Sequence, residues 1–317
     1  MTAKKLVMGL FAAVMTAGAF APAVVYAQQT SYKDSIKAYN GGNKEAAMDV
    51  AMDYKYGWDG AEVNGTKAVE WLEKAFDAGV ARAAAIAGTM YFTGDGVKQD
   101  YSKAEKFYRK AAAKDDESAQ IRLGRMYYYG NGVKTDYESA ARWYASAAKK
   151  YEQSSSCSVA CLYLGQIYYY GWKKGGKLVT NDAESLKWLE KAYNAGYAEA
   201  STLLASINSK GTSEIKQDKA KARKWLLAAA EKGYDPAIKK ITLDYLEGIN
   251  GKPDNIQAYI WAAVLVSRDS SEAAVRVREA ARSRIPAKEQ AKADKMASAA
   301  VKKYENINYE SPASDLD

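Results

Sequence analysis

The chain has 317 residues, of which 48% are hydrophobic and 26% charged, with a formal net charge of +8 and no histidine. Because imidazole is absent, Ser-His-Asp and Cys-His catalysis, histidine metal ligands and histidine pH switches are excluded. Two cysteines are too few for a four-thiolate zinc site. The composition therefore disfavours most hydrolases and zinc proteins. We expect no catalytic residue, no metal and no cofactor.

The first 27 residues have the pattern of a secretory signal peptide. Lys4 and Lys5 precede an apolar run over 6–20, and short side chains lead up to Ala27, as a signal peptidase site requires. The apolar run is shorter than the roughly 20 residues that span a membrane. We expect cleavage after Ala27 and a periplasmic or secreted mature protein without a membrane span.

One sequence unit then recurs six times. Its first element, Ala-x-x-x-Leu-Gly-x-x-Tyr-x-x-Gly, is clearest over 119–130. The residue that follows the Leu of this element, Gly in the clearest copies, lies at positions 51, 88, 124, 165, 205 and 242. A second element follows in each unit and carries an aromatic residue at one fixed place: Trp71, Phe107, Trp143, Trp188, Trp225 and Trp261. A fixed period of this length indicates a repeat architecture.

Each unit is predicted to be two short helices. Ala119, Leu123 and Tyr127 share one helical face, and the second element has the same spacing over 140–147. We expect the large aromatic, such as Trp143, to fill the space beside the small residue of the first helix. Glycines end the first helix, and an N-cap residue precedes the second in every copy: Asn64, Asp100, Asp136, Asn181, Asp218 and Asp254. Asn181 and Glu184 also have the spacing of a capping box.

The third unit carries a family resemblance. It reads Leu123-Gly124-x-x-Tyr127-x-x-Gly130-x-Gly132-Val133-x-x-Asp136, then Ala140-x-x-Trp143, and resembles the Sel-1-like repeat, a relative of the tetratricopeptide repeat. The resemblance covers 46–267 and implies an all-α fold of right-angle stacked helical hairpins forming an α-solenoid. Flanking segments are expected at 28–45 (an N-terminal half-repeat or cap), 268–304 (C-terminal capping helices) and 305–317 (an acidic disordered tail).

The resemblance implies a protein–protein interaction scaffold or adaptor in the bacterial cell envelope, because most members of that family are non-enzymatic adaptors. Two alternatives remain open: a peptidoglycan- or β-lactam-recognising protein of the same fold, and a secreted factor that acts on a host. The cysteine-rich members linked to β-lactams carry paired cysteines in nearly every repeat. This chain has only two, which makes that subgroup a poor match.

A partner would bind the side chains of the first helices that miss the core. In two neighbouring units the candidates are Arg122, Arg125, Tyr128, Tyr129, Tyr163, Gln166, Tyr169 and Tyr170. Tyrosine and arginine are enriched in binding hot spots, so we predict that a peptide or protein segment binds these residues on the concave face. The competing interpretation is that the tyrosines only pack between neighbouring helices.

Charge is distributed unevenly along the chain. Residues 210–303 hold 20 basic and 12 acidic side chains, and the tail after Lys303 holds four acids. The basic segment could meet an anionic envelope polymer, but we favour the simpler interpretation of a solvated surface on lysine-rich helices. Nucleic acid is not an expected partner for an exported chain.

Two further patterns fall in the fourth unit. Cys157 and Cys161 are disulfide candidates, since an exported protein meets an oxidising compartment. Residues 171–177 have the spacing of a phosphate-binding loop, but Leu178 replaces the Ser or Thr that would bind magnesium. We therefore interpret 171–181 as an enlarged repeat turn.

Overall fold

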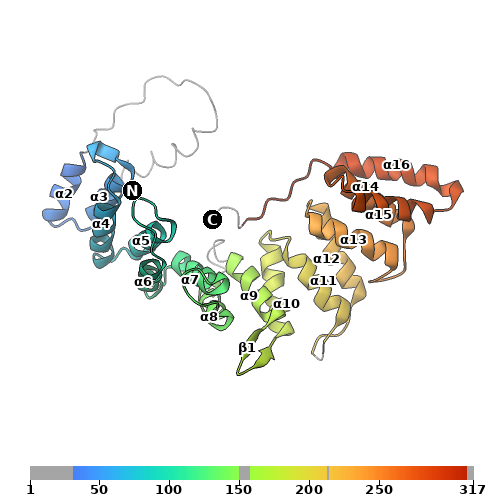
Figure 1. Cartoon of the computed structure of the whole chain (residues 1–317), viewed down its shortest axis with the longest axis horizontal. Helices are drawn as coiled ribbons and strands as arrows, with labels where there is room; N and C mark the ends of the chain where they lie inside the picture. Colours follow the sequence, from blue (N-terminus) through green and yellow to red (C-terminus); the bar gives the residue numbers. More distant parts are fainter. Residues whose placement is uncertain (1–30, 150–157, 213, 313–317) are drawn as a thin grey trace, which may run out of the picture. The chain divides into compact units, whose positions relative to one another are not determined.

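The structure is a computed structural model that describes residues 31–149, 158–212 and 214–312. The chain divides after Lys114 into two compact units, each treated separately below. In both units successive helices pack as hairpins (Figure 1). The signal-peptide prediction for residues 1–27 lies outside the described residues and remains a prediction.

The first unit contains five α-helices and one short 3₁₀ helix within its described residues. They are α2 (Tyr32–Asn40), α3 (Ala46–Tyr56), η1 (Trp58–Gly60), α4 (Gly65–Asp77), α5 (Ala81–Thr93) and α6 (Tyr101–Ala112). Helices α3 and α4 form one predicted hairpin, and α5 and α6 form the next. Helix α2 packs on α3, at the place predicted for the half-repeat.

The second unit continues the same arrangement. Its elements are α7 (Glu117–Tyr129), α8 (Tyr137–Ala148), α9 (Ser158–Tyr170), β1 (Trp172–Lys174), β2 (Lys177–Val179), α10 (Asp182–Asn194), α11 (Ala200–Lys210), α12 (Lys219–Glu231), α13 (Asp235–Glu247), α14 (Asn255–Arg268), α15 (Glu272–Ser283) and α16 (Ala287–Tyr304). Four hairpins run from α7 to α14, and α15 and α16 both pack on α14. Across both units, the predicted solenoid of six helical hairpins is confirmed.

Local capping explains where the second helix of each hairpin begins. Every predicted N-cap side chain accepts a hydrogen bond from the backbone N–H three residues later, at 2.8–3.0 Å. The expected capping box is incomplete. The Glu184 carboxylate accepts from Trp188 Nε1 at 2.8 Å, and no return bond to the Asn181 backbone is formed.

The cap at Asp136 gives a first testable prediction. Its carboxylate accepts from the Ser139 hydroxyl at 2.6 Å and from the Ser139 N–H at 3.0 Å, and these bonds hold the pKa of Asp136 below its ordinary value. Asp136→Ala should lower the free energy of unfolding by about 1 kcal/mol near pH 7, measured by urea denaturation. Asp136→Asn, which keeps the acceptor oxygen, should lose less.

The pH dependence of this cap follows from the direction of its pKa shift. A carboxyl whose pKa is lower in the folded state stabilises the fold above its unfolded pKa and loses that contribution as the pH falls through the folded value. The difference between the parent and Asp136→Ala should therefore be constant near neutrality and shrink below about pH 4. An unchanged difference at pH 2 would contradict this assignment.

In the hairpins that carry a glycine at the small position, the packing differs from the prediction by one residue. A Cβ placed on Gly124 would lie 2.7 Å from Cε1 of Tyr144, and one on Gly88 equally close to the Tyr108 ring. Tyr108 and Tyr144 are fully buried, whereas Trp143 is half-buried. The space beside Gly88 or Gly124 is therefore filled by the residue that follows the repeated aromatic in the sequence. That residue lies about 100° further round the second helix.

The repeated aromatic residues instead contact aromatic rings of nearby helices. Phe107 stacks on Tyr91 at 5.7 Å between ring centroids, and Trp225 meets Tyr193 edge-on at 4.9 Å. In the last hairpin Trp261 stacks on Tyr304 of α16 at 5.2 Å. The Phe107 contact lies within one hairpin, whereas the Trp225 and Trp261 contacts join a hairpin to a neighbouring element.

The enlarged turn of the fourth unit is a β-hairpin, which the all-α prediction did not include. Strands β1 and β2 pair antiparallel, with Trp172 opposite Val179, and the hairpin extends beyond α9 and α10 (Figure 1). Gly175 and Gly176 form the turn with φ of 58° and 82°, as a tight two-residue hairpin turn requires. Strand β2, not a helix N-terminus, follows the glycines directly, so this segment lacks the geometry of a phosphate-binding loop.

Candidate functional site

Helices α7 and α9 begin two successive hairpins and carry the predicted binding residues. On α7 the buried residues Leu123 and Met126 face the core, and on α9 Leu164 and Ile167 do the same. The helical period leaves the residues beside them outside the core. Tyr129 and Tyr170, at the ends of the two helices, are the most exposed of the eight candidates and retain 52% and 62% of their accessible surface.

Four of the predicted residues lie together between α7 and α9. The Tyr128 ring makes edge-on contacts with Tyr129 and Tyr163 at 4.9 and 5.2 Å between centroids. The hydroxyls of Tyr129 and Tyr163 hydrogen-bond at 2.9 Å. The Tyr128 hydroxyl donates to Oε1 of Gln166 at 3.5 Å. The aromatic residues thus form a connected layer across two repeats.

Two tyrosines that were not among the candidates support this layer from α8. Tyr137 meets Tyr128 edge-on at 5.4 Å, and Tyr144 stacks on Tyr163 at 5.1 Å with the rings 8° from parallel. Their part in the layer could not be read from the repeat pattern, because both belong to second helices. The layer therefore rests on the same Tyr144 ring that fills the space beside Gly124.

The phenols of Tyr128, Tyr144 and Tyr163 stay neutral. Burial, assisted by neighbouring tyrosines, raises the pKa of Tyr128 to about 12, and burial also raises the pKa of Tyr144 and Tyr163. The positive charge of the Arg125 guanidinium partly offsets this rise, because it favours the ionised form of both Tyr144 and Tyr163. At physiological pH the layer offers aromatic faces, hydroxyl hydrogen bonds and one adjacent positive charge.

The last two candidate tyrosines continue the layer toward the next repeat. Tyr169 and Tyr170 meet edge-on at 5.0 Å, and the Tyr169 hydroxyl lies 2.7 Å from the Ser206 hydroxyl of α11. Arg122 is half-buried on α7. We call the eight predicted residues the tyrosine surface. The structure brings the tyrosines, Gln166 and Arg125 together, and their binding of a partner remains a prediction.

Comparison with known proteins decides the family. The Sel1 repeat family matches residues 44–80, 81–116, 117–151, 158–197, 198–234 and 245–263. The chain belongs to the Sel1 repeat family. The matches coincide with the helical hairpins described above, the last being partial. Proteins built from these repeats are generally interaction scaffolds and generally non-catalytic.

Similar solved structures also carry Sel1-like repeats. A Sel1 repeat protein from Oxalobacter formigenes is 28% identical over 73% of this chain and 97% of its own, with a TM-score of 0.49. The protective antigen c5321 of uropathogenic Escherichia coli, described as an SLR fold, is 22% identical over 86% of this chain, with a TM-score of 0.48. The chain spans 64% of the length of that antigen. No curated protein sequence matches the chain.

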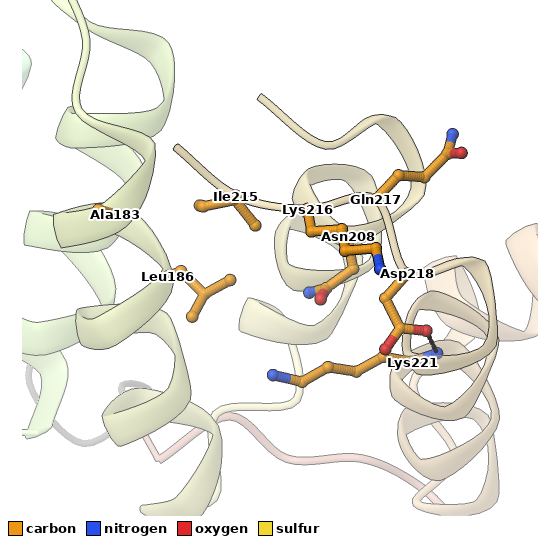
Figure 2. Close-up of a pocket in the computed structure, with 8 residues that line it drawn as sticks. All are labelled: Ala183, Leu186, Asn208, Ile215, Lys216, Gln217, Asp218 and Lys221. Carbon is orange, nitrogen blue, oxygen red and sulfur yellow. Dashed lines mark hydrogen bonds between the residues drawn. The ribbon is translucent and has the colours of Figure 1, made fainter. Parts of the chain in front are cut away.

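A pocket of about 600 Å³ opens between two of the Sel1 repeats (Figure 2). Its apolar wall is formed by Ala183 and Leu186 of α10 and by Ile215 of the loop before α12. Two of the charged groups around it have structural partners. Asp218 caps α12, and the Lys221 ammonium pairs with Glu190 at 2.9 Å. The pocket lining contains no nucleophile–base pair.

The basic segment 210–303 is partly neutralised by ion pairs within the second unit. Several of its cations form ion pairs with carboxylates: Lys221–Glu190, Arg223–Asp244, Lys239–Asp269, Arg268–Asp235, Arg282–Asp294 and Arg284–Glu247. These pairs favour the solvated-surface interpretation over a polyanion site. The structure does not test the polymer-binding alternative.

Three remaining predictions concern cysteines, metals and membranes. Cys161 is buried on α9, but Cys157 lies outside the described residues, so the disulfide remains a prediction. Within the described ranges, no cluster of three or more metal-ligating side chains is found. No helix in those ranges combines the length and apolar character that a membrane crossing requires.

Proposed function

We propose that this chain is a non-enzymatic scaffold of the bacterial cell envelope that binds a peptide or protein segment on the tyrosine surface of α7 and α9. The envelope location rests on the signal-peptide pattern of residues 1–27 and the interaction role on the Sel1 repeats. One observation supports the site itself. Tyr129 is exposed above its ring contacts with Tyr128 and Tyr163, and Tyr170 is exposed beside its ring contact with Tyr169.

This layer suits binding because its exposed rings are already held in place. Tyr129 is fixed by its hydroxyl bond to Tyr163 and its ring contact with Tyr128. A side chain that is ordered before binding loses less conformational entropy when a partner arrives. Tyrosine supplies a large apolar face together with a hydroxyl that can bond to a peptide backbone. These properties match an extended or helical peptide better than a small polar metabolite.

The binding prediction is tested with the two most exposed tyrosines. The double variant Tyr129→Ala, Tyr170→Ala should weaken partner binding by roughly 100- to 1,000-fold, since hot-spot tyrosines contribute about 2 kcal/mol each and such losses are not fully additive. Affinity purification of the tagged mature chain from envelope extract supplies the partner, and titration of the recovered protein supplies the affinity. Thermal unfolding of the double variant should remain close to that of the parent.

A matched control removes exposed apolar side chains elsewhere. Tyr56 and Leu178 are 50% and 65% exposed and lie outside the tyrosine surface. The variant Tyr56→Ala, Leu178→Ala should retain the partner with unchanged affinity. If the two double variants lost the partner equally, the tyrosine surface would not be the site. Recovery of cell-wall polymer alone, equally by all forms, would favour the peptidoglycan-binding alternative.

A further inference from the structure

The C-terminal segment of the chain lies against its own repeats. After α16 ends at Tyr304, residues 305–312 form neither helix nor strand, and Figure 1 shows them leaving α16 as an extended trace. Between 305 and 310 every side chain except Tyr309 is exposed. One tyrosine therefore carries most of the side-chain attachment of this segment.

The Tyr309 hydroxyl is bound by the turn that joins α10 to α11. It donates to the Glu199 carboxylate at 2.5 Å, with the Gly196 carbonyl 3.2 Å away, and accepts from the Ala198 N–H at 2.9 Å. The Tyr309 ring meets Tyr234, before α13, edge-on at 5.3 Å. Burial and Glu199 raise the pKa of Tyr309, so the hydroxyl keeps its proton and can donate it.

A second anchor holds the backbone of the same segment. Arg268 Nη1 donates to the Ile307 carbonyl at 2.7 Å, while its Nη2 donates to the Gly233 carbonyl at 3.0 Å. The Arg268 side chain is only 8% exposed and also pairs with Asp235. At Gly233 a Cβ would lie 2.1 Å from the Ile307 oxygen, so only glycine permits this close approach.

The turn between α10 and α11 contains a backbone N–H whose hydrogen-bond acceptor is the Tyr309 hydroxyl. Ala198 is fully buried, and the Tyr309 oxygen accepts its backbone N–H. A buried N–H that loses its acceptor costs free energy comparable to a lost hydrogen bond. The carboxylate, the buried N–H and the Tyr234 ring together form a receptor for a phenol, and Arg268 fixes the backbone two residues before it.

We propose that Glu199, Ala198, Tyr234 and Arg268 form a binding site for an extended segment that carries a tyrosine, and that residues 307–312 of the chain occupy it as an internal ligand. The site goes beyond the proposed function, because it uses none of the eight residues of the tyrosine surface.

The test supplies the tail from outside as a labelled peptide with the sequence of residues 305–312, measured by fluorescence anisotropy. In the full chain with Tyr309→Ala the phenol position is empty and, of the anchors described above, the tail keeps only its backbone bond to Arg268, so this chain should bind the peptide. The parent chain should bind it at least about 10-fold more weakly, because a tethered segment competes at an effective concentration in the millimolar range. A peptide carrying Tyr309→Phe should bind the vacated site about 10-fold or more weakly, since it lacks the hydroxyl that donates to the carboxylate.

One variant in the site and one control variant outside it test whether the peptide binds at Glu199. In the Tyr309→Ala chain, Glu199→Gln should reduce peptide affinity, whereas Glu73→Gln, on an exposed glutamate of the other unit, should leave it unchanged. Circular dichroism should show the same helicity in all chains. Absence of peptide binding to the folded Tyr309→Ala chain would overturn the proposal, as would equal binding by that chain and the parent. Neither result would bear on the tyrosine surface.

Discussion

Replacing Tyr144 by alanine is expected to lower the free energy of unfolding by about 3–5 kcal/mol, as for other large buried aromatic residues. Tyr144 is fully buried, lies against Gly124 and stacks on Tyr163 of the following repeat. The substitution therefore opens a cavity inside one hairpin and removes a contact between two. Urea denaturation followed by circular dichroism measures the loss.

Two neighbouring substitutions make this prediction specific. Trp143→Ala should cost less, about 1–2 kcal/mol, because Trp143 is only half-buried. Tyr144→Phe should be neutral or slightly stabilising, since among the described residues the buried Tyr144 hydroxyl has no hydrogen-bond partner. A larger loss for Trp143→Ala than for Tyr144→Ala would show that the repeated aromatic, not the residue after it, fills the hairpin.

Asp244→Ala is expected to cost about 3 kcal/mol, because removing one partner of a buried ion pair leaves the other without compensation. The Asp244 side chain is 1% exposed, pairs with the Arg223 guanidinium and accepts the Asn250 N–H at 2.9 Å. Arg223 also lies over the Tyr245 ring at 4.6 Å. Losing the carboxylate therefore loosens the end of α13 and its contact with α12.

An exposed ion pair provides the comparison for Asp244. Glu73 and Lys110 lie 3.3 Å apart with about half of each side chain exposed. Glu73→Ala should change the free energy of unfolding by less than about 1 kcal/mol. If Asp244→Ala had an equally small effect in the same urea titration, the buried pair would not stabilise the last repeats as described.

The features predicted correctly from the sequence are those set by local chemistry. The six N-caps are short polar side chains at a fixed distance before an apolar helical pattern, so each could be identified without its neighbours. The same is true of the glycines that end the first helices, such as Gly94 and Gly130 with φ of 79° and 77°. Local signals repeated at a fixed period were sufficient to predict helical hairpins.

The features that were missed depend on contacts between distant residues. The one-residue error at Trp143 arose because both Trp143 and Tyr144 are large aromatics, and only the orientation of α8 decides which one meets Gly124. The β-hairpin after α9 replaced an expected turn because two glycines allow strand pairing that no helical pattern anticipates. Tyr309 lies 110 residues from Glu199, and no sequence signal links the two.

For the tyrosine surface, the sequence predicted which residues would miss the core but not how they contact one another. The hydroxyl bond between Tyr129 and Tyr163 and the stacking of Tyr144 under Tyr163 join two repeats. The structure also shows that Tyr169 is bonded to Ser206 of the next repeat, so its replacement would disturb packing as well as any binding. Tyr129 and Tyr170 are therefore the better probes of function.

The most direct test of the scaffold proposal is site-specific photo-crosslinking in cells that produce the chain. A benzophenone amino acid is placed at Tyr170 of the tyrosine surface or, as the matched control, at Leu178 of the β-hairpin, which is similarly exposed. We predict a discrete protein adduct from position 170 and none from position 178. Adducts from position 178 alone, or none from position 170, would contradict binding on the tyrosine surface.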